Sequence, residues 1–163
     1  MLPEVIFGAT SCGETSDTQP SESLLGSMSS FQSSAKSEKA ILMLLYNACG
    51  GKDWLQQDAW LTSSNVCNWF GIECNEDENV KALILDNNKV IGTLPSEVFD
   101  LPYLDTLVLE SNEMVVNFDN IMQAQSLKNL NLKNTVLFDL NGLDKALNLK
   151  QLFYLEDVAG EYK

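Results

Sequence analysis

The sequence predicts an α/β repeat protein, a short solenoid of parallel strands that begins with a helical cap. Apolar residues recur in the pattern L-x-x-L-x-L-x-x-N-x-L, and a helix-forming run and a tryptophan-rich segment with two cysteines precede the first copy. The four copies begin at Val80, Leu104, Leu127 and Leu149, which lie 24, 23 and 22 residues apart. A regular period of this length is typical of solenoids, in which each repeat packs only against its neighbours.

The centre of each copy predicts a short strand whose leucines face the interior and whose neighbours pair in parallel. These inward positions are Leu83 and Leu85, Leu107 and Leu109, Leu130 and Leu132, and finally Leu152 and Tyr154. Asn88 and Asn112 follow the first two strands, where a buried amide can bond the backbone of adjacent turns. We therefore predict a structural role for both. Thr135 and Asp157 replace this asparagine in the third and fourth copies.

A helix is predicted to begin after Ser37, which is a favourable N-cap residue, and to end at Gly50-Gly51. The run Ala40–Tyr46 holds seven consecutive apolar residues, which predicts a helix buried on most sides. The next segment carries Trp54, Trp60 and Trp69 between loop residues. We interpret these tryptophans as core residues of an irregular unit.

Cysteine usage indicates an oxidising compartment. Cys67 and Cys74 lie close together in the tryptophan-rich segment, and we interpret them as a disulfide. The alternative is a pair of buried thiols in a reducing cell. Cys12 and Cys49 could pair with each other or remain two free thiols, because sequence does not decide connectivity.

The chain divides into four predicted parts. Residues 1–35 are rich in serine and threonine and predict a flexible leader, 36–79 a cap, 80–157 about four repeats, and 158–163 a tail. The tail is short for a terminal cap, so either the chain is truncated and its repeats continue, or a partner covers the last repeat. The first residues lack the basic region of a signal peptide, which indicates either a removed export signal or a piece of a longer precursor.

Composition argues against several classes of function. The net charge is −13, and the ten basic residues are all lysine, which argues against nucleic acid as a partner. The absence of histidine removes the usual general acid or base, and no G-x-S-x-G motif occurs, so we expect no enzymatic activity and no cofactor. The acidic segment Asn75–Asn79 lacks the pattern of a calcium loop, and we expect no metal site. No apolar run reaches the length of a membrane span.

The segment CNWFGIEC at 67–74, the first repeat at 80–88 and GTLP at 92–95 together resemble the N-terminal cap and first repeat of plant-type leucine-rich-repeat proteins. The upstream run LLYNACGGKDW and Trp60 are similar to the helix and tryptophan part of that cap. The resemblance covers about residues 37–155. It implies a curved solenoid with a parallel β-sheet on its concave face, and a binding role outside the cell or in a lumen. The G-x-L-P motif occurs only once here.

The residues between the repeat leucines are predicted to point to the concave face. The candidate partner-binding residues are Lys81, Ile84, Asp86, Asp105, Val108, Glu110, Lys128, Asn131, Lys133 and Phe153. Counted with Lys150 and Glu156, the charges in these columns cancel, although the whole chain is strongly acidic. A neutral face with an apolar stripe suits a protein or peptide partner. The alternative for Ile84 and Val108 is that β-branched residues simply favour strands.

These observations predict a non-enzymatic module, receptor-like or secreted, that binds a protein or peptide. The second hypothesis is a scaffold subunit held permanently in a larger complex through its uncovered C-terminal end. The Cys67–Cys74 pair, interpreted as a disulfide, places the chain in a secreted, extracellular or lumenal setting.

Overall fold

The computed structural model describes residues 36–137 and 140–154. The predicted leader with Cys12, the predicted tail, and the last positions of the fourth copy, including Glu156 and Asp157, lie outside these ranges. No helix of the described part is long and apolar enough to cross a membrane.

The described part begins with helix α1 (Glu38–Ala48), followed by the 3₁₀ helices Gly51–Asp53 and Val66–Asn68 and by strand β1 (Ile72–Cys74). The hydroxyl oxygen of Ser37 accepts a hydrogen bond from the backbone N–H of Ala40 at 3.2 Å, as expected for an N-cap. Gly50 follows the C-cap of α1 and lies in the left-handed region, with φ of 70°, as is common where a helix ends.

The prediction that α1 is buried on most sides was wrong. Ile41, Leu42 and Leu45 are at most 1% exposed and form one stripe, whereas Met43 is 39% exposed and Ala40 is exposed. Residues three and four positions apart share a helix face, so an uninterrupted apolar run can still turn its other side to solvent.

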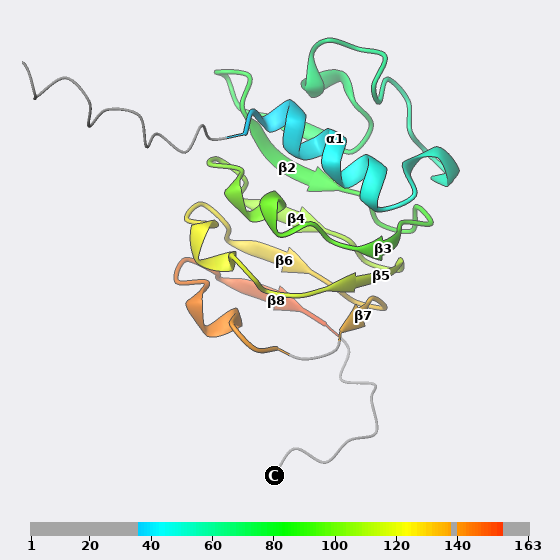
Figure 1. Ribbon diagram of the computed structural model, residues 1–163. Helices are drawn as coiled ribbons and strands as arrows, with labels where there is room; N and C mark the ends of the chain where they lie inside the picture. Colours follow the sequence, from blue (N-terminus) through cyan, green and yellow to red (C-terminus); the bar gives the residue numbers. More distant parts are fainter. Residues whose placement is uncertain (1–35, 138–139, 155–163) are drawn as a thin grey trace, which may run out of the picture. The chain divides into compact units, whose positions relative to one another are not determined.

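The larger sheet contains the predicted strands β2 (Val80–Ile84), β4 (Thr106–Val108), β6 (Asn129–Asn131) and β8 (Gln151–Phe153), all parallel. Register pairs Leu83 with Leu107, Leu107 with Leu130 and Leu130 with Leu152, which confirms the predicted alignment of the copies. Strand β1 adds antiparallel to β2 and begins the sheet. Figure 1 shows these strands stacked in tiers, with α1 beside the first.

A second, smaller parallel sheet contains β3 (Ile91–Thr93), β5 (Glu113–Val116) and β7 (Val136–Leu137). Each of these strands leads into a 3₁₀ helix: Ser96–Asp100, Ile121–Gln123 and Leu143–Lys145. These helices stack on one another and the first packs against α1, so each repeat is one turn of a coil (Figure 1). Pro95 precedes the first of them, outside the strand ladder, where its missing N–H costs no sheet hydrogen bond.

Buried asparagines link each turn to the unit before it. Asn112 is 3% exposed, and its side-chain oxygen accepts hydrogen bonds from the backbone N–H groups of Asn88 and Val90, both at 3.0 Å. Its amide donates to the backbone carbonyls of Leu85 at 2.7 Å and Leu109 at 2.9 Å. The side chain therefore satisfies four buried backbone groups in two repeats.

The same position in the first and third copies has different partners. Asn88 lies next to the cap, and its side chain donates to the carbonyl of Gln56 at 2.9 Å and accepts from the N–H of that residue at 2.7 Å. Thr135 in the third copy donates only to the carbonyl of Leu132 in its own repeat, at 2.8 Å. Among the described residues at this repeat position, only the two asparagines therefore bond to the preceding unit.

An aromatic cluster forms the core of the cap. The ring centroid of Trp60 lies 5.6 Å from that of Tyr46, 4.9 Å from that of Trp54 and 4.7 Å from that of Trp69. All four side chains are buried, and each indole N–H donates to a backbone carbonyl. The tryptophans thus pack the irregular segment against α1.

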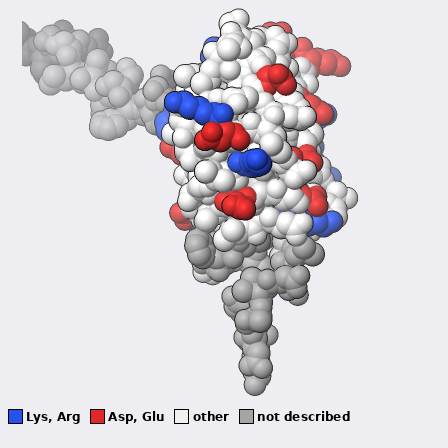
Figure 2. All heavy atoms as spheres, turned by 90° about the vertical axis from the view of Figure 1, so that its right-hand side faces the viewer, with Lys and Arg blue, Asp and Glu red and all other residues white. Residues whose placement is uncertain are grey.

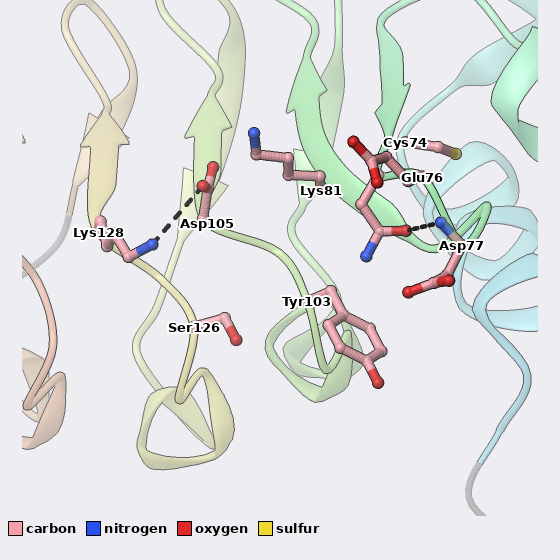
Figure 3. Close-up of a pocket in the computed structure, with 9 residues that line it drawn as sticks. Cys74, Glu76, Asp77, Lys81, Tyr103, Asp105, Ser126 and Lys128 are labelled. Carbon is pink, nitrogen blue, oxygen red and sulfur yellow. Dashed lines mark hydrogen bonds and ion pairs between the residues drawn. The ribbon is translucent and has the colours of Figure 1, made fainter.

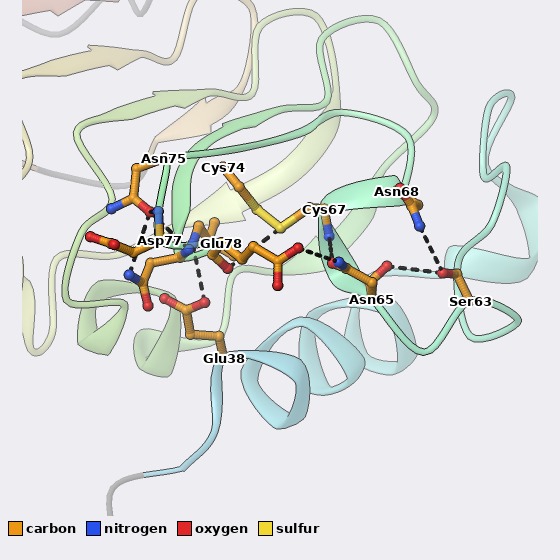
Figure 4. The surroundings of a disulfide bond; sticks show 11 residues. Glu38, Ser63, Asn65, Cys67, Asn68, Cys74, Asn75, Asp77 and Glu78 are labelled. Atoms are coloured by element: carbon orange, nitrogen blue, oxygen red, sulfur yellow. Dashed lines mark hydrogen bonds between the residues drawn. A yellow bond between two sulfur atoms is a disulfide. The ribbon is translucent and has the colours of Figure 1, made fainter.

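The predicted disulfide joins Cys67 in the second 3₁₀ helix to Cys74 at the end of β1 (Figure 4). Beside it, the side-chain oxygen of Asn65 accepts from the N–H of Cys67 at 2.8 Å, and its amide donates to the carboxylate of Glu78 at 3.2 Å. The carboxylate of Glu38 accepts from the N–H of Val80 at 3.1 Å and so connects α1 to the first repeat. The disulfide therefore fixes β1, the strand with which the larger sheet begins.

Replacing Cys67 and Cys74 together with serine is expected to lower the free energy of unfolding by roughly 2–3 kcal/mol, because a short closed loop is released in the unfolded chain. Urea unfolding followed by tryptophan fluorescence would measure it. Reductant should shift the wild-type curve to that of the variant and leave the variant unmoved. Coincident wild-type and variant curves without reductant would contradict the prediction.

Candidate functional site

The outward side chains of the larger sheet lie in columns set by the strand register. One column runs through Ile84, Val108, Asn131 and Phe153, because each of these residues pairs with the next across neighbouring strands. The first three are half-buried, whereas the ring of Phe153 is 41% exposed. The register thus places these candidates together, while their role in binding stays a prediction.

Polar side chains on this face bond across strands. The amide of Asn131 donates to the carboxylate of Glu110 at 2.7 Å, and the amide of Asn129 donates to the hydroxyl of Thr106 at 3.1 Å. The Thr106 hydroxyl donates in turn to the carboxylate of Asp105 at 2.8 Å. Side chains held in this way lose little freedom when a partner binds.

Charged side chains of both signs lie on this face. The ammonium of Lys128 lies 3.8 Å from the carboxylate of Asp105, and that of Lys133 lies 5.1 Å from the ring centroid of Phe153. Lys81 and Asp86 are exposed, and the side chain of neither forms a hydrogen bond or ion pair with another described residue. Figure 2 shows one side of the molecule on which lysines and carboxylates are interspersed, and not gathered by sign.

A shallow open groove crosses this face beside the cap (Figure 3). Its lining includes the predicted residues Lys81, Asp105 and Lys128. It also includes residues that the sequence did not single out as binding candidates: Glu76 and Asp77 in the turn after β1, Tyr103 before β4 and Ser126 before β6. Tyr103 and Ser126 directly precede the first leucine of their copies, and that shared repeat position is the signal that could have identified them.

The acidic turn beside the groove is closed by its own first residue. The side-chain oxygen of Asn75 accepts from the backbone N–H groups of Asp77 at 3.0 Å and Asn79 at 2.9 Å. Such an Asx turn is a common way for asparagine to mimic a backbone turn. The turn therefore holds the backbone of Glu76 and Asp77 in place.

Cys49 is the free cysteine of the described part, and its thiol is fully buried. Burial raises the pKa of this thiol to about 12, so at neutral pH it is protonated and unreactive. Within residues 36–137 and 140–154, no group of three or more histidine, cysteine or carboxylate side chains is placed to hold a metal ion.

Comparisons with known proteins support one fold. No family profile matches the chain. Over 53 residues, 31% of its length, the chain is 38% identical to polygalacturonase inhibitor 1 of Arabidopsis thaliana, of which it spans only 16%. It is similar in structure to a plant ice-binding protein, with a TM-score of 0.60 and 26% identity over 71% of this chain and 40% of that one.

A further similar structure is the leucine-rich-repeat ectodomain of the Arabidopsis receptor kinase HAESA, solved with a peptide hormone ligand. The TM-score is 0.60 at 23% identity, over 73% of this chain and 20% of that one. The chain has the plant-type leucine-rich-repeat fold. The expected parallel sheet and the disulfide-linked, helical cap of this leucine-rich-repeat solenoid are confirmed. The predicted borders of cap and repeats, 36–79 and 80–157, stay predictions.

Proposed function

We propose that this leucine-rich-repeat chain is a non-enzymatic module that binds a protein or peptide on the outer face of β2, β4, β6 and β8. In this proposal residues 36–79 serve as the cap, residues 80–157 form the repeats, and the chain works outside the cell or in a lumen. The Cys67–Cys74 bond supports that setting, because disulfides persist in oxidising compartments.

The observation that carries the proposal is the exposed ring of Phe153 in line with Ile84 and Val108. Large aromatic side chains surrounded by hydrogen-bonding groups are typical anchors of protein interfaces. Charges of both signs flank this column and favour a partner of mixed polarity over a highly charged polymer.

The similar proteins support the proposal in a limited way. One is an inhibitor of polygalacturonase, another is a receptor ectodomain in complex with a peptide hormone, and a third binds ice. One fold therefore hosts different functions, so the outer-face side chains have to carry the assignment here. Whether the module is secreted or part of a receptor belongs to the same proposal.

A capture experiment with an extract of the native source tests it. The wild-type chain is compared with a variant that carries Phe153→Ala and Val108→Asp, which removes the aromatic anchor and places a charge in the column. We expect proteins or peptides retained by the wild type to be reduced at least tenfold, about 1.4 kcal/mol, by the variant.

The matched control carries Ile91→Ala and Val136→Asp. Ile91 and Val136 are 46% and 45% exposed on strands of the smaller sheet, so they change equivalent surface on another face. The control should retain the same ligands as the wild type, and both variants should keep the wild-type melting temperature within a few degrees. Undiminished capture by the Phe153 and Val108 variant would refute the proposal.

The scaffold hypothesis stays the second candidate because apolar residues are exposed in the third and fourth copies. Leu147 is 80% exposed and Leu140 41%, and Leu152 is half-buried where Leu83, Leu107 and Leu130 are fully buried. Exposed apolar side chains in larger numbers favour association. A chain that remains monomeric in light scattering at high concentration would count against a scaffold role.

A further inference from the structure

Three charged side chains that line the groove beside the cap have no partner among the described residues. Lys81 projects from β2 between the acidic turn and the ion pair of Lys128 with Asp105 (Figure 3). Its ammonium has no hydrogen-bonding or ionic partner among the described residues, and the carboxylates of Glu76 and Asp77 have none either. One free cation and two free anions therefore line the same groove.

Tyr103 adds an apolar surface to this polar groove. Its side chain is 49% exposed and lies between Ser126 and the acidic turn. An exposed tyrosine ring beside carboxylates can pack against the long stem and charged head of an arginine or lysine. The ring and the two carboxylates thus favour a basic group at one end of the groove.

The groove is prepared before binding. The turn that carries Glu76 and Asp77 is closed by Asn75, and the preceding Cys74 is tied to Cys67. At the other end, Asp105 is held by the hydroxyl of Thr106 at 2.8 Å and lies 3.8 Å from the Lys128 ammonium. Groups that are already held in place reduce the conformational entropy that the protein loses on binding.

We propose that this groove binds an extended peptide segment in which a basic and an acidic side chain are separated by one residue. The acidic side chain would pair with Lys81, and the basic one with Glu76 and Asp77 against the ring of Tyr103. Alternate side chains of an extended chain face the same way about 7 Å apart, so a single segment can present both charges to this groove. The inference rests on the proposed function and assigns one subsite of its binding face.

Electrostatics separate this ligand from simpler ones. A uniformly anionic chain, such as an acidic polysaccharide, would meet Lys81 but be repelled by the carboxylates of Glu76, Asp77 and Asp105. A uniformly basic peptide would leave Lys81 facing like charge. A segment that carries both a basic and an acidic side chain can neutralise the charges at both ends of the groove.

The test uses the full 163-residue chain and immobilised heptapeptides with acetylated and amidated ends. The peptides carry one arginine and one glutamate separated by one residue, in both orders, beside peptides with two arginines, two glutamates or no charge. We expect one order of the mixed pair to retain about fivefold more protein than the uniformly charged peptides, as two exposed ion pairs would give, and this advantage to fall at high salt.

Three variants locate the effect. Lys81→Gln should remove the contribution of the glutamate, and Asp77→Asn should weaken that of the arginine. Exchange of the two charges, Lys81→Glu with Asp77→Lys, should reverse the preferred order of the mixed pair. Lys150→Gln is the matched control, because Lys150 occupies the same repeat position as Lys81 but lies outside the groove lining. It should leave the preference unchanged.

Equal retention of all peptides, or stronger retention of the peptides with two glutamates, would overturn the inference. If that result came with capture that still depends on Phe153 and Val108, the binding function would stand without this subsite. A mixed-charge preference together with capture that ignores Phe153 and Val108 would support the groove and overturn the wider proposal.

Discussion

Replacing Asn112 with alanine is expected to lower the free energy of unfolding by about 3–5 kcal/mol. The substitution leaves the N–H groups of Asn88 and Val90 and the carbonyls of Leu85 and Leu109 without their side-chain partner. Each buried backbone group left unsatisfied costs about 1–3 kcal/mol, and water entering the space relieves part of the total.

Chemical unfolding of the variant, followed by circular dichroism, measures this change. Asn134→Ala is the matched control, since Asn134 is exposed and donates only to the hydroxyl of Ser111 at 3.2 Å. It should change stability by less than about 0.5 kcal/mol. Equal effects of the two substitutions would show that the Asn112 bonds contribute nothing beyond those of a surface side chain.

Trp60→Ala is expected to cost about 3–5 kcal/mol, the range for truncating a large buried aromatic. Trp60 is 3% exposed at the centre of the cluster, with ring contacts to Tyr46, Trp54 and Trp69. Its indole N–H also donates to the carbonyl of Phe70 at 2.9 Å, so the variant loses both packing and a hydrogen bond. Because Trp60 belongs to one buried core that continues from the cap into the repeat leucines, the loss should reach beyond the cap.

The measurement is thermal unfolding of the whole chain at far-ultraviolet wavelengths, where helix and strands both contribute. Leu55→Ala serves as the control, since Leu55 lies in the same segment but is 56% exposed. We expect the control to melt close to the wild type and Trp60→Ala to melt well below it. A cap that melts separately while the strands keep the wild-type transition would contradict the predicted coupling.

The strand register was predictable because the inward leucines recur at nearly constant spacing. Leu83, Leu107 and Leu130 are fully buried and pair in the order that the period predicts. The smaller sheet was not predictable in the same way. Its strands read Ile91-Gly-Thr, Glu113–Val116 and Val136-Leu137, and they share neither length nor a polar alternation. They form because the coil brings them together, which is a tertiary effect.

The cap shows a second limit of sequence reasoning. Strand β1 has only three residues, and it becomes a strand because it folds back on β2 next to the Cys67–Cys74 bond. The one-sided burial of α1 was not predictable either. The seven apolar residues from Ala40 have no polar interruption, so the pattern does not indicate which face of the helix is buried.

Part of the candidate site follows from the period and part does not. The column from Ile84 to Phe153 could be listed once the copies were aligned, since each residue holds the same repeat position. The groove needed two further facts: that β1 lies beside β2, and that the residues preceding the strands, such as Tyr103, project beside the acidic turn. Neither fact is local to one repeat.

The asparagine links give the stack a direction. Asn88 fastens the first repeat to the cap at Gln56, Asn112 fastens the second repeat to the first, and Thr135 bonds only within the third. The side chains of both asparagines bond to the unit that precedes their own repeat in the chain, and neither side chain bonds to a described residue of the repeat that follows. Loss of the fourth repeat would leave the bonds of Asn88 and Asn112 intact, whereas loss of the cap would remove Gln56, the partner of Asn88. The side-chain bonds at this repeat position therefore make each of the first two repeats depend on the unit before it, and in the end on the cap.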